Sequence, residues 1–219
     1  MNTLVCHPRF YTALFFLVTI LCCYPLLAQD RMPPISSENM TPKQRLAVAG
    51  LLEARGIAPR GPWVPLLRSP EVMQRARAMG DYARYNTSLP PRLSEFLILM
   101  TAREWTQQYE WYAHSNIAVD AGLDPDIVKA IAEGRHPEVM GPDEAILYSF
   151  FTELHSTKGI SDATYEQAIG AFGERGVIDS VGIIGYYTLL AMTMNVARTP
   201  IPGNPPPPLQ PFTTRSLGN

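Results

Sequence analysis

The sequence predicts an all-α fold, with a single helical domain of about seven to eight helices. Two observations predict this fold class. First, residue pairs that typically begin helices recur along the chain; they are Thr41-Pro42, Ser69-Pro70, Asp124-Pro125, Gly141-Pro142 and Ser161-Asp162. Second, strand signals are poor, because the 219 residues contain no sustained apolar–polar alternation and no Asn-Gly hairpin turn.

Residues 1–28 have the layout of a secretory signal peptide. A weakly basic start is followed by an uncharged, mostly apolar run over residues 10–28, and Ala28 offers a small residue before polar Gln29. We therefore expect cleavage of this segment and export, to the periplasm or outside the cell. The alternative is an N-terminal membrane anchor, since the run is about long enough to span a bilayer, although Pro25 interrupts it.

The three cysteines, Cys6, Cys22 and Cys23, all lie in this N-terminal segment. A cleaved product would have no thiolate for a disulfide, for a metal or for a peroxidase cycle. The formal net charge of −2 and the lack of a basic stripe argue against nucleic-acid partners. The sequence also lacks His-Glu-x-x-His spacing and a Gly-rich phosphate loop, so we expect neither a metal nor a cofactor.

After a polar linker at residues 29–40, helices are expected to fill residues 41–199. The first begins at Thr41, where Pro42 and Gln44 complete a capping-box pattern, and Gly56 ends it. Residues 60–67 have the composition of a loop. The later predicted helices span residues 69–85, 93–105, 107–121, 124–133, 141–154, 161–172 and 176–198, and the last of these is the most apolar.

Residues 200–219 form a proline-rich tail. The four prolines at residues 205–208 favour an extended polyproline II conformation and cannot continue a helix. We expect either a disordered terminus or an arm laid across a neighbouring subunit. A proline-motif ligand for a partner domain is a further alternative.

The most informative stretch is EFLILMTAREWTQQYEWYAHSNIAVDAGL, residues 95–123. Glu110 and His114 are four residues apart, so they lie on one face of a helix, and Gln107 lies one turn before them. Glu110 falls in the first helical turn, where the helix dipole favours a carboxylate, so we expect it to be ionised and to orient the ring of His114. A histidine held in this way can act as a general acid or base. The alternative is a satisfied polar pair in a helical core.

Two runs in and around this stretch, LPPRLSEFLILMTAR (residues 89–103) and YEWYAHSNIAVDAGL (residues 109–123), resemble the carboxymuconolactone decarboxylase family, which includes the alkylhydroperoxidase D-like (AhpD-like) proteins. Peroxidase members of that family carry a Cys-x-x-Cys motif shortly before a histidine. Counting back from His114, Gln107 and Glu110 occupy the two cysteine positions. The chain therefore resembles a branch that lacks both thiols, and the resemblance covers about residues 63–202.

The resemblance implies an all-α, carboxymuconolactone decarboxylase/AhpD-like domain that assembles into a homo-oligomer, a trimer or a hexamer, with pockets near subunit contacts. The decarboxylase branch acts on a small carboxylated lactone without a cofactor. By analogy His114 would be the proton donor, Glu110 its orienter and Glu95 a second carboxylate near the pocket.

The resemblance also suggests which residues would bind the substrate. Arg103 would anchor a substrate carboxylate, with a salt bridge to a neighbouring glutamate as the alternative. The other substrate-binding candidates are Gln107, Trp111, Tyr187 and Asn195. Core packing is the alternative for the last two, which belong to a long apolar helix.

We therefore expect an exported, cofactor-independent decarboxylase or isomerase of a small carboxylic acid or lactone. Membrane contact is expected only through an uncleaved N-terminal segment. A non-catalytic oligomer that binds a small molecule or a protein is the alternative, so enzyme activity stays open. Hydroperoxide reduction is disfavoured, because the mature chain would have no cysteine.

Overall fold

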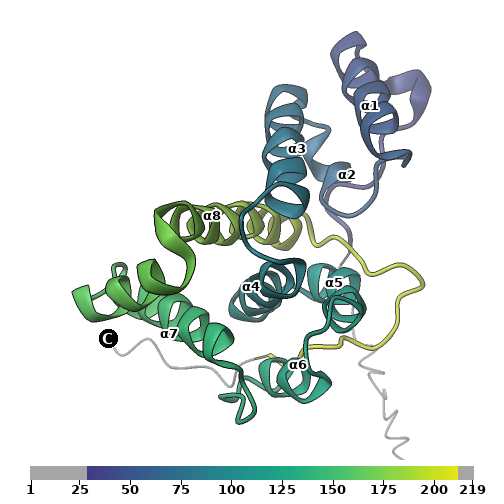
Figure 1. The fold of residues 1–219 in the computed structure, drawn as a ribbon. Coiled ribbons are helices and arrows are strands. Elements are labelled where there is room, and N and C mark those ends of the chain that lie inside the picture. Colours follow the sequence, from purple (N-terminus) through teal and green to yellow (C-terminus); the bar gives the residue numbers. More distant parts are fainter. Residues whose placement is uncertain (1–28, 212–219) are drawn as a thin grey trace, which may run out of the picture.

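The computed structural model describes residues 29–211, and in this range every regular element is a helix (Figure 1). The all-α prediction is therefore confirmed. The predicted signal peptide, the three cysteines and residues 212–219 of the tail lie outside the described residues. The elements are a short 3-10 helix (Ser37–Asn39), α1 (Pro42–Arg55), α2 (Trp63–Leu66), α3 (Pro70–Tyr85), α4 (Pro91–Glu104), α5 (Gln108–Asp120), α6 (Pro125–Ala132), α7 (Pro142–Thr157) and α8 (Asp162–Ala197).

Helix α4 is the central element of the domain. It packs against α3, α5, α6, α7 and α8, and Figure 1 shows it among them. All its residues from 93 to 103 are buried, as expected for a helix that faces protein on every side. The polar side chains in this run therefore need partners inside the protein. They are Ser94, Glu95, Thr101 and Arg103.

A sharp corner joins α4 to α5. Thr106 adopts φ 46°, a left-handed conformation, and the backbone N–H of Gln107 donates to the carbonyl of Ala102 at 2.7 Å. Gln107 then caps α5, because its Oε1 accepts from the backbone N–H groups of Tyr109 at 2.6 Å and Glu110 at 3.3 Å. The predicted start of this helix at residue 107 is thus confirmed to within one residue.

Helix α8 is interrupted at Gly173, where φ is 67° and ψ is 173°, a combination that only glycine adopts readily. This break separates the two helices that the sequence predicted at residues 161–172 and 176–198. Ser161 caps the first part, because its side chain accepts from the backbone N–H of Thr164 at 3.4 Å. By length and composition α8 could cross a membrane, but 56% of its most apolar stretch is buried inside the domain.

Residues 63–66 form the single-turn helix α2, where the sequence analysis predicted a loop. The prediction was wrong because it relied on the turn signal of Gly61-Pro62, whereas tertiary packing decides the conformation of the residues that follow. Trp63, Pro65 and Leu66 are buried there, and α2 contacts both α3 and α8. Burying a large aromatic side chain outweighs a weak local preference.

The described part of the tail, residues 200–211, contacts α4 and α5 of its own chain. The side-chain amide of Gln108 pairs with the backbone of Leu209, donating to its carbonyl at 2.8 Å and accepting from its N–H at 2.9 Å. Arg103 Nη1 donates to the carbonyl of Gln210 at 2.6 Å. Leu209 itself is fully buried. Figure 1 shows this segment running past α5 towards α6.

The predicted linker also contacts the domain. The backbone N–H of Arg31 donates to the carbonyl of Ala197 at the end of α8, at 2.8 Å. Farther along, Arg68 Nη2 donates to the carbonyl of Pro33 at 2.6 Å. The capping box predicted at Thr41 and Gln44 is present, so the sequence signal for the start of α1 is confirmed.

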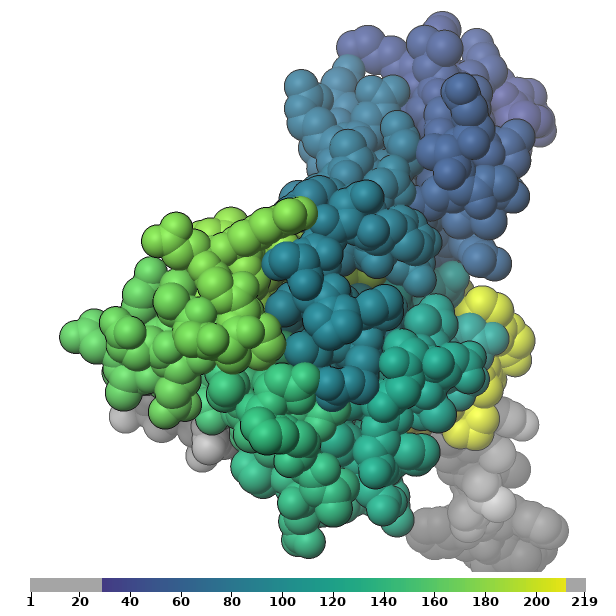
Figure 2. Space-filling view, in the orientation of Figure 1, coloured from purple at the N-terminus to yellow at the C-terminus, as the bar shows by residue number. Residues whose placement is uncertain are grey.

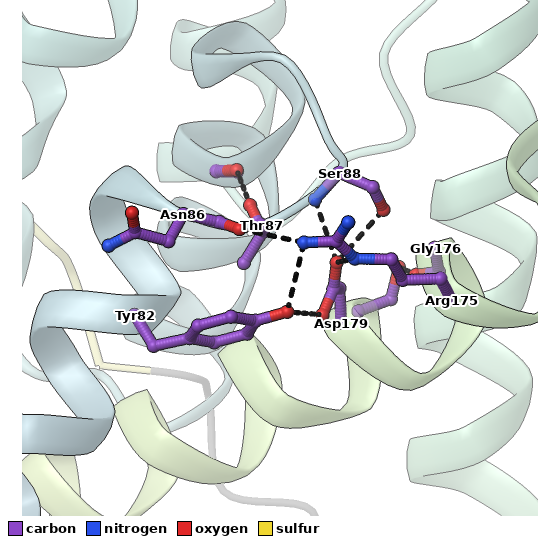
Figure 3. Close-up of polar contacts among 9 residues, drawn as sticks. Tyr82, Asn86, Thr87, Ser88, Arg175, Gly176 and Asp179 are labelled. Carbon is purple, nitrogen blue, oxygen red and sulfur yellow. Dashed lines mark hydrogen bonds and ion pairs between the residues drawn. The ribbon is translucent and has the colours of Figure 1, made fainter.

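A buried carboxylate, Asp179, fixes the loop that leads into α4 (Figure 3). It accepts hydrogen bonds from Tyr82 Oη at 2.8 Å, from Ser88 N at 2.7 Å and from Ser88 Oγ at 2.8 Å. Burial acts to raise the pKa of Asp179, but these hydrogen bonds and the nearby charge of Arg175 outweigh it, so the pKa lies below its usual value. Asp179 thus ties α8 to the end of α3 and to the segment before α4.

We predict that Asp179→Asn lowers the free energy of unfolding by about 1–3 kcal/mol at neutral pH, because it weakens charge-assisted hydrogen bonds. The folded pKa of Asp179 lies below the unfolded one, so its contribution is present above about pH 4 and is lost as pH falls further. Urea unfolding at several pH values measures this effect.

The difference between wild type and Asp179→Asn should therefore shrink below about pH 4. Asp120→Asn, at an exposed position at the end of α5, is the matched control and should change stability little. A difference that stays constant down to about pH 2 would contradict this role of Asp179.

Candidate active site

The candidate site centres on a buried pair between two packed helices. His114 on α5 and Glu95 on α4 lie with Nδ1 and Oε2 2.7 Å apart. The two residues are only 8% and 6% exposed. A short hydrogen bond between a histidine and a carboxyl group fixes the orientation of the ring. Because Nδ1 faces Glu95, the other ring nitrogen, Nε2, is the one left for a bound molecule.

Glu110 is not the partner of His114, and this part of the sequence prediction was wrong. Both carboxylate oxygens of Glu110 are buried and accept no hydrogen bond from the described residues. Burial raises the pKa of Glu110 well above its usual value. The helix dipole stabilises a carboxylate by only about 0.3–1 kcal/mol, whereas burying an unpaired charge costs several times more. Glu110 is therefore held as a neutral acid and does not orient the histidine.

Two tyrosines of α8 stand beside the pair. The ring of Tyr187 meets the ring of His114 edge to face, with centroids 5.2 Å apart, and Tyr186 meets Tyr187 in the same way at 5.0 Å. Burial raises the pKa of Tyr187 well above its usual value and that of Tyr186 to about 12. Both hydroxyls therefore stay protonated at neutral pH and can donate hydrogen bonds.

A cavity of about 120 Å³ opens next to His114. It is walled by residues from α1, α3, α5, α8 and the segment around α2; they are Arg55, Ile57, Arg60, Pro62, Trp63, Arg84, Tyr109, His114, Tyr186, Tyr187 and Leu190. Of the residues that the sequence singled out, only His114 and Tyr187 line it. Glu95 acts behind His114, as its buried partner.

The structure places the other candidates outside this cavity. Gln107 Nε2 donates to Asn195 Oδ1 at 2.8 Å, and Asn195 Nδ2 donates to the carbonyl of Trp105 at 3.0 Å, so these amides join the α4–α5 corner to α8. Trp111 is part of the hydrophobic core. Arg103 meets the tail at Gln210. None of these four candidate side chains lines the cavity.

Two glycines allow aromatic rings to reach the cavity. A Cβ on Gly61, which has φ 55°, would collide with the ring of Tyr109, and a Cβ on Gly80 would collide with the hydroxyl end of Tyr186. Both rings line the cavity. The sequence analysis missed the roles of the two glycines and of the arginines that line the cavity, and the loop composition of residues 60–67 was the visible signal near them.

No protein-family model and no curated protein sequence matches this chain. Solved structures do match. One is the AhpD core of an uncharacterized peroxidase-related protein from Ralstonia eutropha JMP134, with a TM-score of 0.63 and 15% identity over 77% of this chain and 90% of that one. Another is an uncharacterized peroxidase-related protein from Silicibacter sp. TM1040, with a TM-score of 0.62 and 13% identity over 77% and 88%.

A third similar structure is a cysteine-to-alanine variant of the debrominase Bmp8 in complex with 2,3,4-tribromopyrrole, with a TM-score of 0.61 and 14% identity over 83% of this chain and 95% of that one. Together these likenesses show that the chain has the AhpD-like fold. The resemblance predicted from the sequence is confirmed at the level of the fold.

We predict that Glu110→Gln becomes more stable relative to wild type as pH rises. The folded pKa of Glu110 is raised, so stability is greatest below the unfolded pKa, about 4.3, and is lost as pH rises towards the folded pKa. The glutamine variant has no proton to lose, so it should gain on wild type by about 1 kcal/mol or more between about pH 4 and pH 8. Urea unfolding across this range measures the difference.

Glu104→Gln, at an exposed position at the end of α4, serves as the control and should follow wild type. If Glu110→Gln and wild type keep a constant difference over this pH range, Glu110 is ionised in the folded protein and our description of it fails.

Proposed function

We propose that this protein is a cofactor-independent lyase or isomerase that acts on a small organic acid or lactone, with His114 as the general acid/base. The observation that carries the proposal is the 2.7 Å contact between His114 Nδ1 and the buried Glu95 at the wall of a cavity. A carboxylate behind a histidine stabilises the imidazolium that forms when Nε2 takes a proton.

The bonds and protons in both proposed reactions can be accounted for with His114, Tyr186 and solvent. In a decarboxylation, the carbon–carbon bond to the carboxylate breaks, carbon dioxide leaves, and the electron pair stays on the substrate carbon as an enolate. His114 then gives its Nε2 proton to that carbon and regains a proton from solvent. In an isomerisation, His114 takes a proton from one carbon and returns it to another. Tyr186, with its protonated hydroxyl, is a suitable donor to the enolate oxygen.

The positions that carry thiols in family peroxidases support acid–base chemistry rather than thiol chemistry. Gln107 caps a helix, and Glu110 is a buried neutral acid. The sequence has no cysteine after residue 23, so hydroperoxide reduction at this site would have no thiolate to attack the peroxide. The similarity to peroxidase-related proteins therefore supports a shared fold and not, in our proposal, a shared reaction.

We also propose that the protein is exported and forms a homo-oligomer. Export follows from the layout of residues 1–28. Self-association is supported by an apolar stripe on α8 with helical spacing, whose exposed members are Ile178, Val181, Leu189, Met192 and Val196. The steps between these residues are three, eight, three and four, which keep them on one face of the helix, and such a stripe suits packing against the same stripe of a second copy.

We predict that His114→Gln lowers the turnover rate by about a hundredfold to ten-thousandfold, because it removes the group proposed to transfer the proton to or from carbon. The assay incubates a panel of small carboxylic acids and lactones with the protein in deuterium oxide and follows each by NMR. Enzymatic protonation at carbon places deuterium in the product or in recovered substrate, so the reaction is detected whichever product forms.

Glu95→Gln should also slow turnover, by a smaller factor, because the ring loses its carboxylate partner. His136→Gln, at an exposed loop histidine, is the matched control and should retain full activity. Circular dichroism establishes that each variant is folded. Turnover that survives in a folded His114→Gln variant would contradict the proposed function, as would panel ligands that bind wild type without any reaction or exchange.

A further inference from the structure

A second and larger cavity lies outside the one at His114. It has a volume of about 490 Å³ and lies between the end of α1 and α3. Four residues line both cavities, namely Arg55, Ile57, Arg60 and Arg84, so the outer cavity leads into the inner one. In Figure 2, α1 and α3 form the lobe at the top of the molecule, and Figure 1 shows the two helices there side by side.

The junction between the two cavities is rich in positive charge. Arg55, Arg60 and Arg84 line it, while Asp81 is the carboxylate among the lining residues. Asp81 pairs with Arg55 Nη2 at 2.8 Å, and it also pairs with Arg77 at 3.1 Å. Asp81 is therefore already shared between two arginines. In the described part of the chain, neither Arg60 nor Arg84 forms a salt bridge.

Arg84 is the better placed of these two arginines. Its Nε is buried and has no hydrogen-bond partner among residues 29–211. Its guanidinium lies over the ring of Tyr85, with 5.2 Å from Cζ to the ring centroid. Stacking on an aromatic face leaves the in-plane N–H groups free to bind planar or tetrahedral oxyanions with two parallel hydrogen bonds. A buried donor without a partner is costly, so the described contacts leave the guanidinium of Arg84 incompletely satisfied.

We propose that Arg84, assisted by Arg60, forms an oxyanion-binding site at this junction, so that the protein takes ligands with a carboxylate or phosphate group held there. Such a ligand has an uncharged end that extends through the inner cavity towards His114, while any larger part occupies the outer cavity. The direction of the uncharged end rests on the proposed function. The oxyanion site itself stands on the charges and cavities alone.

The experiment compares three probes of similar shape, namely benzoate, phenyl phosphate and benzamide, by isothermal titration calorimetry on the purified protein. We expect at least one of the two anions to bind at least about tenfold more tightly than the neutral amide. Whichever anion binds more tightly identifies the preferred oxyanion. Equal binding of all three probes, or no tighter binding of either anion, would overturn the proposal.

Variants locate the site. Arg84→Gln should weaken binding of the favoured anion about tenfold and leave benzamide binding unchanged, and Arg60→Gln should cause a smaller loss. Arg84→Lys should recover part of the affinity, because it keeps the charge without the guanidinium fork. Arg75→Gln, at an exposed position on α3 outside both cavities, is the control. Anion affinity that is unchanged in both Arg84→Gln and Arg60→Gln would show that the anion binds elsewhere and would contradict the proposal.

The His114→Gln variant separates this inference from the proposed function. It should keep the anion affinity of wild type although it loses turnover. Arginine-dependent anion binding without any turnover by wild type would overturn the reaction and leave the oxyanion site standing. Turnover that depends on His114 but not on Arg60 or Arg84 would support the proposed reaction and overturn the oxyanion site.

Discussion

The hydrogen bond between Glu95 and His114 is the interaction on which the rest of the site depends. It follows from the burial of α4, which leaves Glu95 inside the protein and only 6% exposed. A carboxylate in that position is tolerated only with a strong partner, because an unpaired buried charge costs several kcal/mol, roughly as much as the stability of a whole domain. Helix α5 supplies that partner at 2.7 Å. The same contact sets the direction of the imidazole of His114, which lines the cavity.

Several structural contacts keep the two helices in the register that this bond needs. The Gln107 cap and the Gln107–Asn195 bond fix the corner between α4 and α5 relative to α8. The tail adds a second restraint, because Leu209 is held by the side-chain amide of Gln108 at the start of α5. At the other end, Asp179 holds the loop before α4. The residues that the family resemblance suggested as substrate contacts thus include some that position the helices.

The sequence predicted every α-helix except α2 and singled out His114, Glu95 and Tyr187, but it did not predict which other residues wall the cavity. Capping pairs such as Thr41-Pro42 act locally, so they predict helix starts in any fold. The partner of His114 could not be predicted from spacing, since the i,i+4 rule describes one helix and Glu95 comes from another. Glu110 was misjudged because desolvation, which depends on the whole fold, exceeds the local helix dipole. Arg60 and Arg84 were missed because only the tertiary approach of α3 and the segment before α2 brings them to one cavity.

The most direct test of the Glu95–His114 pair is the protonation pattern of the His114 ring, read by ¹⁵N NMR on histidine-labelled protein. The contact with Glu95 predicts that the neutral ring carries its proton on Nδ1, with Nε2 as the free acceptor, and that Glu95→Gln shifts both nitrogen resonances. His136→Gln allows the other resonances to be assigned without disturbing the pair. A ring protonated on Nε2, or one whose resonances are indifferent to Glu95→Gln, would show that Glu95 does not orient His114 and would contradict the central claim.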